Sequence, residues 1–317
     1  MTLDPQIAGM IGALDSGFPP VHTMTGAQAR ATIRSRFVPA TDPEPLGAVT
    51  DTSIRGPGGE LAVRIYRPLS DAAALPVVVY AHGGGFVFCD LDSHDGLCRN
   101  LANRIGAVIV SVGYRLAPEN PWPAGAEDLY AAVEWVAGQA DALGVDPDQI
   151  LVGGDSAGGN LAAVTALMAR DRGGPALAGQ LLIYPVIAAD FDTESYRLFG
   201  QGFYNPAPAL RWYWDQYVPD TTDRRTPYAS PLAADLAGLP PAVVVIAGCD
   251  PLRDEGMAYA DALTAADVAV TRLVYEGGVH GFLTMPMLDL AQRARAEVSD
   301  AVAQLLSVSP AGSTHVR

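Results

Sequence analysis

The feature that most constrains the fold is a set of short apolar runs that recur along the chain from residue 77 onward. Such runs would be apolar on both faces of a strand, which is typical of strands that helices cover from both sides. Strands buried in this way are characteristic of parallel sheets. We therefore expect a parallel core sheet. The runs are Val77–Ala81, Ala107–Val112, Ile150–Val152, Leu181–Tyr184 and Val243–Ala247.

Amphipathic stretches with recognisable ends separate these runs. Ser93 is a candidate N-cap for a helix that carries Leu97, Leu101 and Ile105 on one face and ends at Gly106. An alternating strand at 61–66 comes before the runs, and a last strand is predicted at Val270–Tyr275. This alternation predicts an α/β fold with a mostly parallel, doubly wound sheet. The other predicted helices are Ala126–Ala137, Ala157–Arg172, Asp254–Ala266 and Asp289–Leu306.

Two stretches interrupt this rhythm. Residues 1–45 hold a helical stripe, Ile7 to Leu14, before a proline-rich segment. Residues 187–228 crowd aromatic side chains into an otherwise polar segment, as an insertion placed over a site would. Most of these aromatic residues are expected to pack in a core. The tail, 309–317, is predicted to be disordered.

Charge excludes two classes of partner. The chain has 35 acidic and 20 basic residues, a net charge of −15, and every basic residue is Arg. Nucleic acids and anionic membrane surfaces both require a cationic footprint, so neither is an expected partner.

Cysteine content and hydropathy indicate the compartment. The three cysteines, Cys89, Cys98 and Cys249, are too few and too odd in number for a disulfide framework. They are expected to be buried thiols in a reducing compartment. Neither a signal peptide nor an apolar run of about 18 residues is found. We expect a cytoplasmic protein without stable membrane insertion.

The strongest local signal is Gly154-Asp155-Ser156-Ala157-Gly158-Gly159. It follows a predicted strand and opens a predicted helix, so it reads as a nucleophile elbow. In such a turn the residues two before and two after the serine crowd each other, and Gly154 and Gly158 meet that need. The N–H of Ala157, at the positive end of the helix dipole, faces any anion formed beside Ser156. The alternative is a glycine-rich phosphate turn, but neither nucleotide-binding spacing is present.

A second glycine-rich element, His82-Gly83-Gly84-Gly85-Phe86, follows the strand Val77–Ala81. Consecutive glycines allow backbone N–H groups to approach a ligand, as the oxyanion of an acyl-transfer intermediate requires. Because the carboxyl ends of parallel strands share one sheet edge, the loop is expected near Ser156. A flexible turn is the alternative.

A serine nucleophile needs a base and an acid that orients it. His280 follows the last strand in a glycine-rich loop and is the candidate base, whereas His82 is expected to be structural. The remaining histidines, His22, His94 and His315, are interpreted as surface residues. Asp250, in the loop after Val243–Ala247, is the candidate acid. Pro251 suits a first helical position, and Asp254, the alternative acid, falls in the first helical turn.

The chain order Ser, Asp, His, with this elbow and glycine loop, is that of α/β-hydrolases. The combination resembles the hormone-sensitive-lipase-like carboxylesterases, and the segment 114–119 is similar to that family as well. The resemblance implies a helical cap formed by 1–45 and 187–228, around an α/β-hydrolase core of 46–186 and 229–308. It also implies that Gly84 and Gly85, with Gly83 as a third candidate, join Ala157 as oxyanion donors.

The predicted function is hydrolysis of short- to medium-chain carboxylic esters through an acyl-enzyme formed on Ser156. The substrate is a small molecule. No cofactor or metal is expected, because neither paired cysteines nor a His-Glu-x-x-His pattern is present. An amide, lactone or thioester hydrolase would use the same machinery, and a ligand-binding receptor on the same fold is a third interpretation.

The last strand carries one charge, Arg272, and the resemblance implies that it lies at a sheet edge. An exposed apolar edge is a template for a partner strand, which favours a two-fold homodimer. The alternative is a monomer whose edge is covered by the closing helix, 289–306.

Overall fold

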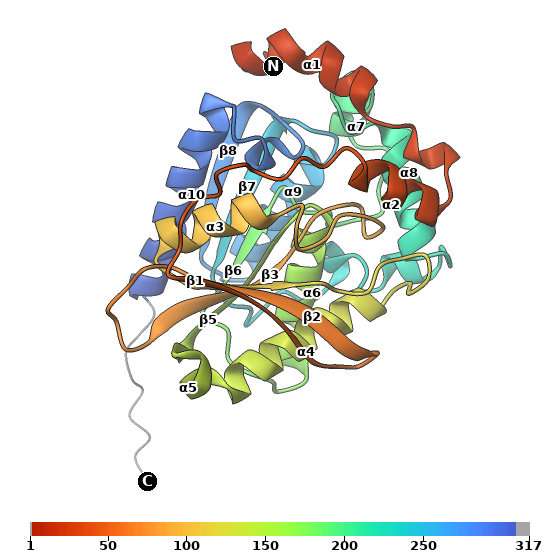
Figure 1. Cartoon of the computed structure of the whole chain (residues 1–317). Helices are drawn as coiled ribbons and strands as arrows, with labels where there is room; N and C mark the ends of the chain where they lie inside the picture. Colours follow the sequence, from red (N-terminus) through yellow and green to blue (C-terminus); the bar gives the residue numbers. More distant parts are fainter. Residues whose placement is uncertain (1, 309–317) are drawn as a thin grey trace.

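Eight strands form one sheet in the order β1-β2-β4-β3-β5-β6-β7-β8 in the computed structural model, which describes residues 2–308 (Figure 1). The pairs from β4 to β8 are parallel, and β1 and β2 join as antiparallel strands. The expected mostly parallel α/β sheet is confirmed. The strands are β1 Ala48–Gly56, β2 Gly59–Arg67, β3 Leu75–Ala81, β4 Val108–Val112, β5 Val145–Asp155, β6 Gly179–Ile183, β7 Ala242–Cys249 and β8 Val270–Val279.

Helices cover both faces of this sheet, and the apolar runs explain why. Val77 and Val79 of β3 belong to the core that includes α4, α6 and α9, whereas Val78 and Tyr80 belong to the core that includes α3 and α10. Alternate residues of a strand point to opposite faces, so only an apolar run fills both cores. These helices are α3 Asp95–Ile105, α4 Ala124–Gly138, α6 Ala157–Asp171, α9 Arg253–Ala265 and α10 Asp289–Val308, with the short α5 Ala140–Leu143 after α4.

The two interrupting stretches fold into helices that gather on one side of the molecule (Figure 1). Residues 1–45 contain α1 Pro5–Gly17 and α2 Gly26–Arg34, and residues 187–228 contain α7 Glu194–Phe199 and α8 Ala207–Tyr217. Most aromatic side chains of the second stretch are buried, as expected, including Trp214 and Tyr217.

Several predicted boundaries and contacts were wrong. Strand β1 was not predicted, because its first six residues are exposed and show no apolar pattern. The alternation at 61–66 indicates a half-exposed strand, yet Tyr66, on the same face as Arg64, is fully buried because it packs in the core that includes α3. Ser93 does not cap α3: His94 precedes the helix without a side-chain cap, and Ser93 Oγ donates to the carbonyl of Asp90 instead.

Two further corrections concern the ends of β7 and β8. β8 runs to Val279 rather than stopping at Tyr275, since Val279 still pairs with Cys249 after a bulge in the register. Pro251 is not the first helical residue: β7 runs two residues further than predicted, to Cys249, so α9 begins at Arg253 with Leu252 as its N-cap.

No helix within residues 2–308 is long and apolar enough to cross a membrane. The tail predicted to be disordered lies outside the described residues. The three cysteines are free; Cys98 and Cys249 are buried and Cys89 is half-buried.

Candidate active site

Ser156 lies in a strained turn between β5 and α6, with φ 56° and ψ −118°. A Cβ atom on Gly154 would lie 2.4 Å from the carbonyl carbon and oxygen of Gly158, and one on Gly158 would lie 2.0 Å from the carbonyl oxygen of Ala81. Side chains at these two positions would collide with backbone that cannot move aside. Steric crowding therefore explains why both positions are glycine, as expected for a nucleophile elbow.

His280 connects this serine to a carboxylate. Its Nε2 lies 2.8 Å from Ser156 Oγ, and its Nδ1 lies 2.7 Å from Asp250 Oδ2. Asp250 is fully buried, and its Oδ1 accepts a hydrogen bond from the N–H of Leu252 at 2.9 Å. The structure brings together all three residues that the sequence nominated, in one continuous line of hydrogen bonds.

Strand geometry positions both partners of the serine. Asp250 directly follows β7 and His280 directly follows β8, and these two strands are neighbours in the sheet. Ser156 directly follows the end of β5, two strands from β7. Because all three strands are parallel, their carboxyl ends meet at one edge, where the three side chains converge.

The alternative acid, Asp254, lies elsewhere. Its Oδ2 accepts from the N–H of Ser195 at 2.7 Å, at the start of α7, and its Oδ1 pairs with Arg253. Glu255 is buried; its Oε1 accepts from the N–H of Ile187 at 2.7 Å, and burial raises the pKa of its carboxyl well above the usual value. Both acids lie in α9 and accept hydrogen bonds from the backbone of the stretch 187–228, and neither contacts His280.

The glycine loop after β3 faces the same cavity as Ser156. Gly84 and Gly85 have φ values of 119° and 58°, which L side chains rarely adopt, and both line the cavity. Among the described residues, the N–H groups of Gly84 and Gly85 have no hydrogen-bond acceptor. The N–H of Gly83, by contrast, donates to Asp155 Oδ1 at 3.0 Å. Gly83, the third candidate for an oxyanion donor, therefore already has an acceptor.

Two histidines lie beside this loop. His82 is buried, stacks on Tyr114 with ring centroids 4.4 Å apart, and burial lowers its pKa to about 4. Its expected structural role agrees with these contacts. His94 was expected on the surface, which is wrong: it is 5% exposed and its Nε2 lies 3.3 Å from the Asp155 carboxylate. His22 is exposed as expected, and His315 lies outside the described residues.

The cavity above Ser156 has a volume of about 360 Å³. Six of the residues that line it are Phe or Tyr, and four of these six come from the two interrupting stretches. Cys89 also lines the cavity, but burial raises the pKa of its thiol to about 12, so it is not a thiolate at neutral pH. The aromatic wall residues are Phe18, Phe37, Phe88, Tyr184, Tyr204 and Tyr213.

Serine, imidazole and carboxylate in hydrogen-bond contact can activate a hydroxyl for attack on a carbonyl. Free N–H groups beside the serine can stabilise the oxyanion that forms. Within residues 2–308, no group of three or more His, Cys, Asp or Glu side chains could hold a metal ion. The fold and the site together define an α/β hydrolase.

Comparisons with known proteins agree with this class. The family described as alpha/beta hydrolase fold matches residues 78–284. The carboxylic ester hydrolase LipN of Mycobacterium tuberculosis is 46% identical over 265 residues, which cover 81% of this chain and 70% of LipN. The ethyl acetate hydrolase of Pseudomonas putida is 37% identical over 321 residues, which cover 96% of this chain and 100% of that protein.

A solved structure gives the same result. The ester hydrolase EH1AB1 from the metagenome of Lake Arreo has a TM-score of 0.91 to this chain at 38% identity, covering 97% of this chain and 100% of EH1AB1. The chain belongs to the alpha/beta hydrolase fold family and, within it, to the hormone-sensitive-lipase-like carboxylesterases. It is a carboxylic ester hydrolase.

Two residues of this region were missed by the sequence analysis. Asp155 stands inside the elbow motif but was given no role, and His94 was interpreted as a surface residue. The two lie 61 positions apart and meet only because β3 and β5 are paired, so no local pattern signals their contact.

Proposed function

We propose that the protein hydrolyses short- to medium-chain acyl esters through a catalytic triad of Ser156, His280 and Asp250. The observation that carries the proposal is the pair of contacts made by His280, 2.8 Å to Ser156 Oγ and 2.7 Å to Asp250 Oδ2. These are hydrogen-bond lengths, and they give each ring nitrogen a different partner.

The reaction has two halves. Ser156 Oγ attacks the ester carbonyl while His280 Nε2 takes its proton, and the N–H groups of Gly84, Gly85 and Ala157 hold the oxyanion. His280 then gives the proton to the leaving alcohol, and an acyl-enzyme remains. Water, activated by His280, releases the acid. Asp250 fixes the tautomer of His280 and stabilises its charged form throughout.

The preference for short acyl chains rests on the cavity. A volume of about 360 Å³ is at the lower end of the range for small-molecule sites, roughly 300–1,000 Å³. We propose that residues 1–45 and 187–228 form the cap that closes it, around a core of 46–186 and 229–308. Phe18 and Phe37 from the first stretch and Tyr204 and Tyr213 from the second, all at the cavity, support this division.

A panel of p-nitrophenyl esters from acetate to palmitate tests the substrate range. We expect the highest kcat/KM at acyl chains of about two to eight carbons, within what a pocket of this size accepts. A fluorophosphonate probe should label wild type at Ser156 and leave Ser156→Ala unlabelled. Faster hydrolysis of palmitate than of butyrate would overturn the chain-length proposal, and labelling elsewhere would overturn the nucleophile.

We propose that the protein also forms a homodimer through β8. This strand has one neighbour in the described sheet, β7, and Val274 on it is 37% exposed. The backbone of Gly277, near its end, already accepts from the N–H of Asp4, so the open part of the edge is Val270–Tyr275. Sedimentation equilibrium should give a dimer for wild type and a monomer for Val274→Lys. A wild type that is monomeric at tens of micromolar, or a dimer that the lysine does not change, would overturn this interface.

We propose a cytoplasmic location as well. It is supported by the free thiols of Cys98 and Cys249, which are buried and unpaired in the described structure. Fractionation of cells that express the chain tests it, and recovery mainly in a membrane or exported fraction would contradict it.

A further inference from the structure

A second buried histidine–carboxylate pair lies beside Ser156, on the side of β3. Asp155 is 3% exposed and His94 is 5% exposed, and His94 Nε2 lies 3.3 Å from the carboxylate oxygens. The residue just before Ser156 is thus an acid withdrawn from solvent. Burying a carboxylate is unfavourable unless its oxygens accept hydrogen bonds or pair with a positive charge. The mechanism proposed above uses neither residue.

The carboxylate of Asp155 holds the start of the glycine loop. Its Oδ1 accepts from Tyr80 Oη at 2.8 Å and from the N–H of Gly83 at 3.0 Å. Burial opposes ionisation of Asp155, but the charge of His94 and the hydrogen bonds from His94 and Tyr80 outweigh it and lower the pKa. An ionised acceptor makes the stronger bond to Gly83 N–H. Gly84 follows directly, so this bond fixes the backbone that presents the oxyanion donors.

The hydrogen bonds around His94 show how its ring meets this carboxylate. Ser93 Oγ lies 2.7 Å from the carbonyl of Asp90, to which it donates, and it accepts from the N–H of Asp90 at 2.9 Å. His94 Nδ1 lies 3.0 Å from the same Oγ, so Ser93 fixes the orientation of the ring. His94 Nε2 lies 3.3 Å from the Asp155 carboxylate, and the N of Gly83 lies 3.3 Å from the same Nε2. The ring of His94 therefore contacts both the Asp155 carboxylate and the loop residue that this carboxylate holds.

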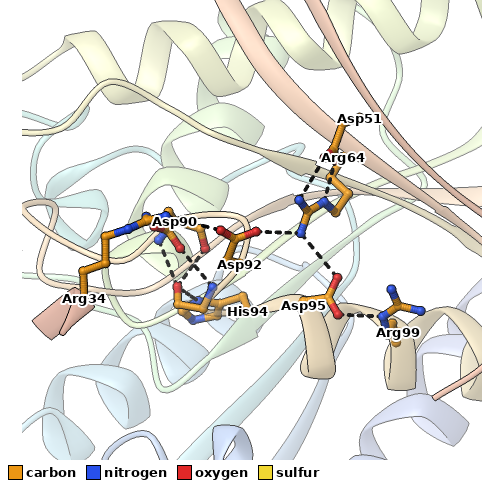
Figure 2. A network of polar contacts seen from close by, with 9 residues as sticks. Arg34, Asp51, Arg64, Asp90, Asp92, His94, Asp95 and Arg99 are labelled. Atoms are coloured by element: carbon orange, nitrogen blue, oxygen red, sulfur yellow. Dashed lines mark hydrogen bonds and ion pairs between the residues drawn. The ribbon is translucent and has the colours of Figure 1, made fainter. Parts of the chain in front are cut away.

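The array extends outward to the helix α2 (Figure 2). Arg34 of α2 forms an ion pair with Asp90, and Asp90 Oδ1 accepts from the N–H of Ser93 at 3.0 Å. The Arg34 side chain is 68% exposed, however. Solvent screens exposed ion pairs and leaves them little effect on stability, so the buried part of the array is the part that can hold the loop.

We propose that Asp155 and His94 are positioning residues for the oxyanion loop: His94 holds the Asp155 carboxylate in place, and Asp155 holds Gly83 so that Gly84 and Gly85 point at the oxyanion. The inference rests on the proposed active site. Each donor of an oxyanion hole is worth roughly 10²–10³ in kcat, and its placement matters to a few tenths of an ångström. Losing the anchor should therefore weaken transition-state binding more than substrate binding.

The experiment compares Asp155→Ala with Asp155→Asn. In the Asn variant the amide oxygen can still accept from Tyr80 and Gly83. In the Ala variant Tyr80 loses its acceptor, and the N–H of Gly83 keeps only the longer contact of 3.3 Å with His94 Nε2. We expect the Ala variant to lose roughly 10²-fold in kcat with KM within about threefold, and the Asn variant to stay within about tenfold of wild type. His94→Ala should lose roughly tenfold, and His94→Gln should recover part of that loss.

The readout specific to the loop is inhibition by a trifluoromethyl ketone, whose serine adduct carries an oxyanion, beside the matching methyl ketone. Its Ki should rise in parallel with the loss in kcat/KM across the four variants, while the methyl ketone Ki stays constant. An unchanged trifluoromethyl ketone Ki in a variant with reduced kcat would overturn the proposal. Should Asp155→Ala fail to fold, the two His94 variants carry the same test.

Asp95→Asn is the matched control. Asp95 belongs to the same polar network but to the branch that leads away from Asp155, where it pairs with Arg64 at 3.4 Å and Arg99 at 2.6 Å (Figure 2). Its kcat and both Ki values should equal those of wild type; a loss equal to that of His94→Ala would overturn the assignment to the inner branch. If wild type itself hydrolyses no ester and binds neither ketone, the proposed function fails, which is distinct from failure of the positioning role.

Discussion

Two buried histidine–carboxylate pairs flank Ser156, and they make different contacts with it. Asp250 and His280 follow β7 and β8 on one side, and the ring of His280 reaches Ser156 Oγ at 2.8 Å. Asp155 and His94 lie toward β3 on the other side, where the carboxylate holds the N–H of Gly83 at 3.0 Å. One pair thus contacts the nucleophile through its histidine, whereas the other contacts the backbone of the glycine loop through its carboxylate.

The difference lies in what surrounds each ring and each carboxylate. His280 stands between its acid and a hydroxyl that opens on the cavity, so it can pass a proton to substrate. The two ring nitrogens of His94 lie 3.0 Å from Ser93 Oγ and 3.3 Å from the Asp155 carboxylate, so within the described residues neither contacts the Ser156 hydroxyl. The chemical role of a histidine–aspartate pair therefore depends on the third group that the pair contacts. The two residue types alone do not assign that role.

The largest effect should come from breaking the first pair at its reacting end. Ser156→Ala and His280→Ala should each lose on the order of 10⁶ in kcat, as for triad residues elsewhere, because nucleophile and base act as one unit. Steady-state hydrolysis of p-nitrophenyl butyrate measures this. His22→Ala, at an exposed histidine, is the control and should match wild type. Activity within about tenfold of wild type would remove either residue from the mechanism, since that is only 1.4 kcal/mol.

The acid of the first pair should have the next largest effect. Asp250→Asn should lose about 10⁴ in kcat because the tautomer of His280 is no longer fixed. Asp254→Asn should leave kcat within a few-fold and lower the free energy of unfolding by about 0.5–1.5 kcal/mol, through its bond to Ser195. Kinetics and urea unfolding of both variants separate the two roles. The reverse ranking of activities would overturn the assignment of Asp250.

Gly83→Ala should disturb the second pair without changing either of its members. A Cβ at this position would lie 2.4 Å from Asp155 Oδ2, so the loop or the carboxylate must shift. We expect kcat to fall roughly 10- to 100-fold, less than for complete loss of the donors. Gly96→Ala in α3, where no atom lies within 4 Å of the new Cβ, is the control. Equal kcat for both variants would show that the Gly83–Asp155 contact does not position the loop.

Glu255, a buried carboxyl without a histidine partner, should produce the smallest effect, visible in stability rather than activity. Burial raises its pKa, so the folded state binds the proton more tightly than the unfolded state. The stabilisation is fully present below the unfolded pKa of about 4.3 and is lost as pH rises through the raised folded pKa. Urea unfolding from pH 5 to pH 8 should show wild type losing stability relative to Glu255→Gln.

The glutamine keeps an oxygen to accept from the N–H of Ile187, so the two proteins should agree best at pH 5. Glu60→Gln, at an exposed glutamate, is the control and should follow wild type at every pH. A difference between wild type and Glu255→Gln that stays constant with pH would contradict the buried, protonated carboxyl.

The local patterns of the sequence were sufficient for the strands and for the first pair. Runs such as Val77–Ala81 are apolar on both faces, and their order with the helices determined a doubly wound sheet. Ser156, Asp250 and His280 could be nominated because each directly follows a strand of that sheet, and parallel strands bring their carboxyl ends together. Glycines at 154 and 158 added a steric requirement that few other turns share.

Only the tertiary structure decided the second pair. Ser93 looked like a helix cap because a serine before an apolar stripe usually is one, yet it bonds to Asp90 and His94. His94 was interpreted as a surface residue because it stands at the start of a predicted helix; its partner is 61 positions away, at the end of β5. A sequence pattern describes residues that are neighbours along the chain, whereas a contact between two buried side chains depends on which strands pack side by side. That choice is made by the whole sheet, through the pairing of β3 with β5.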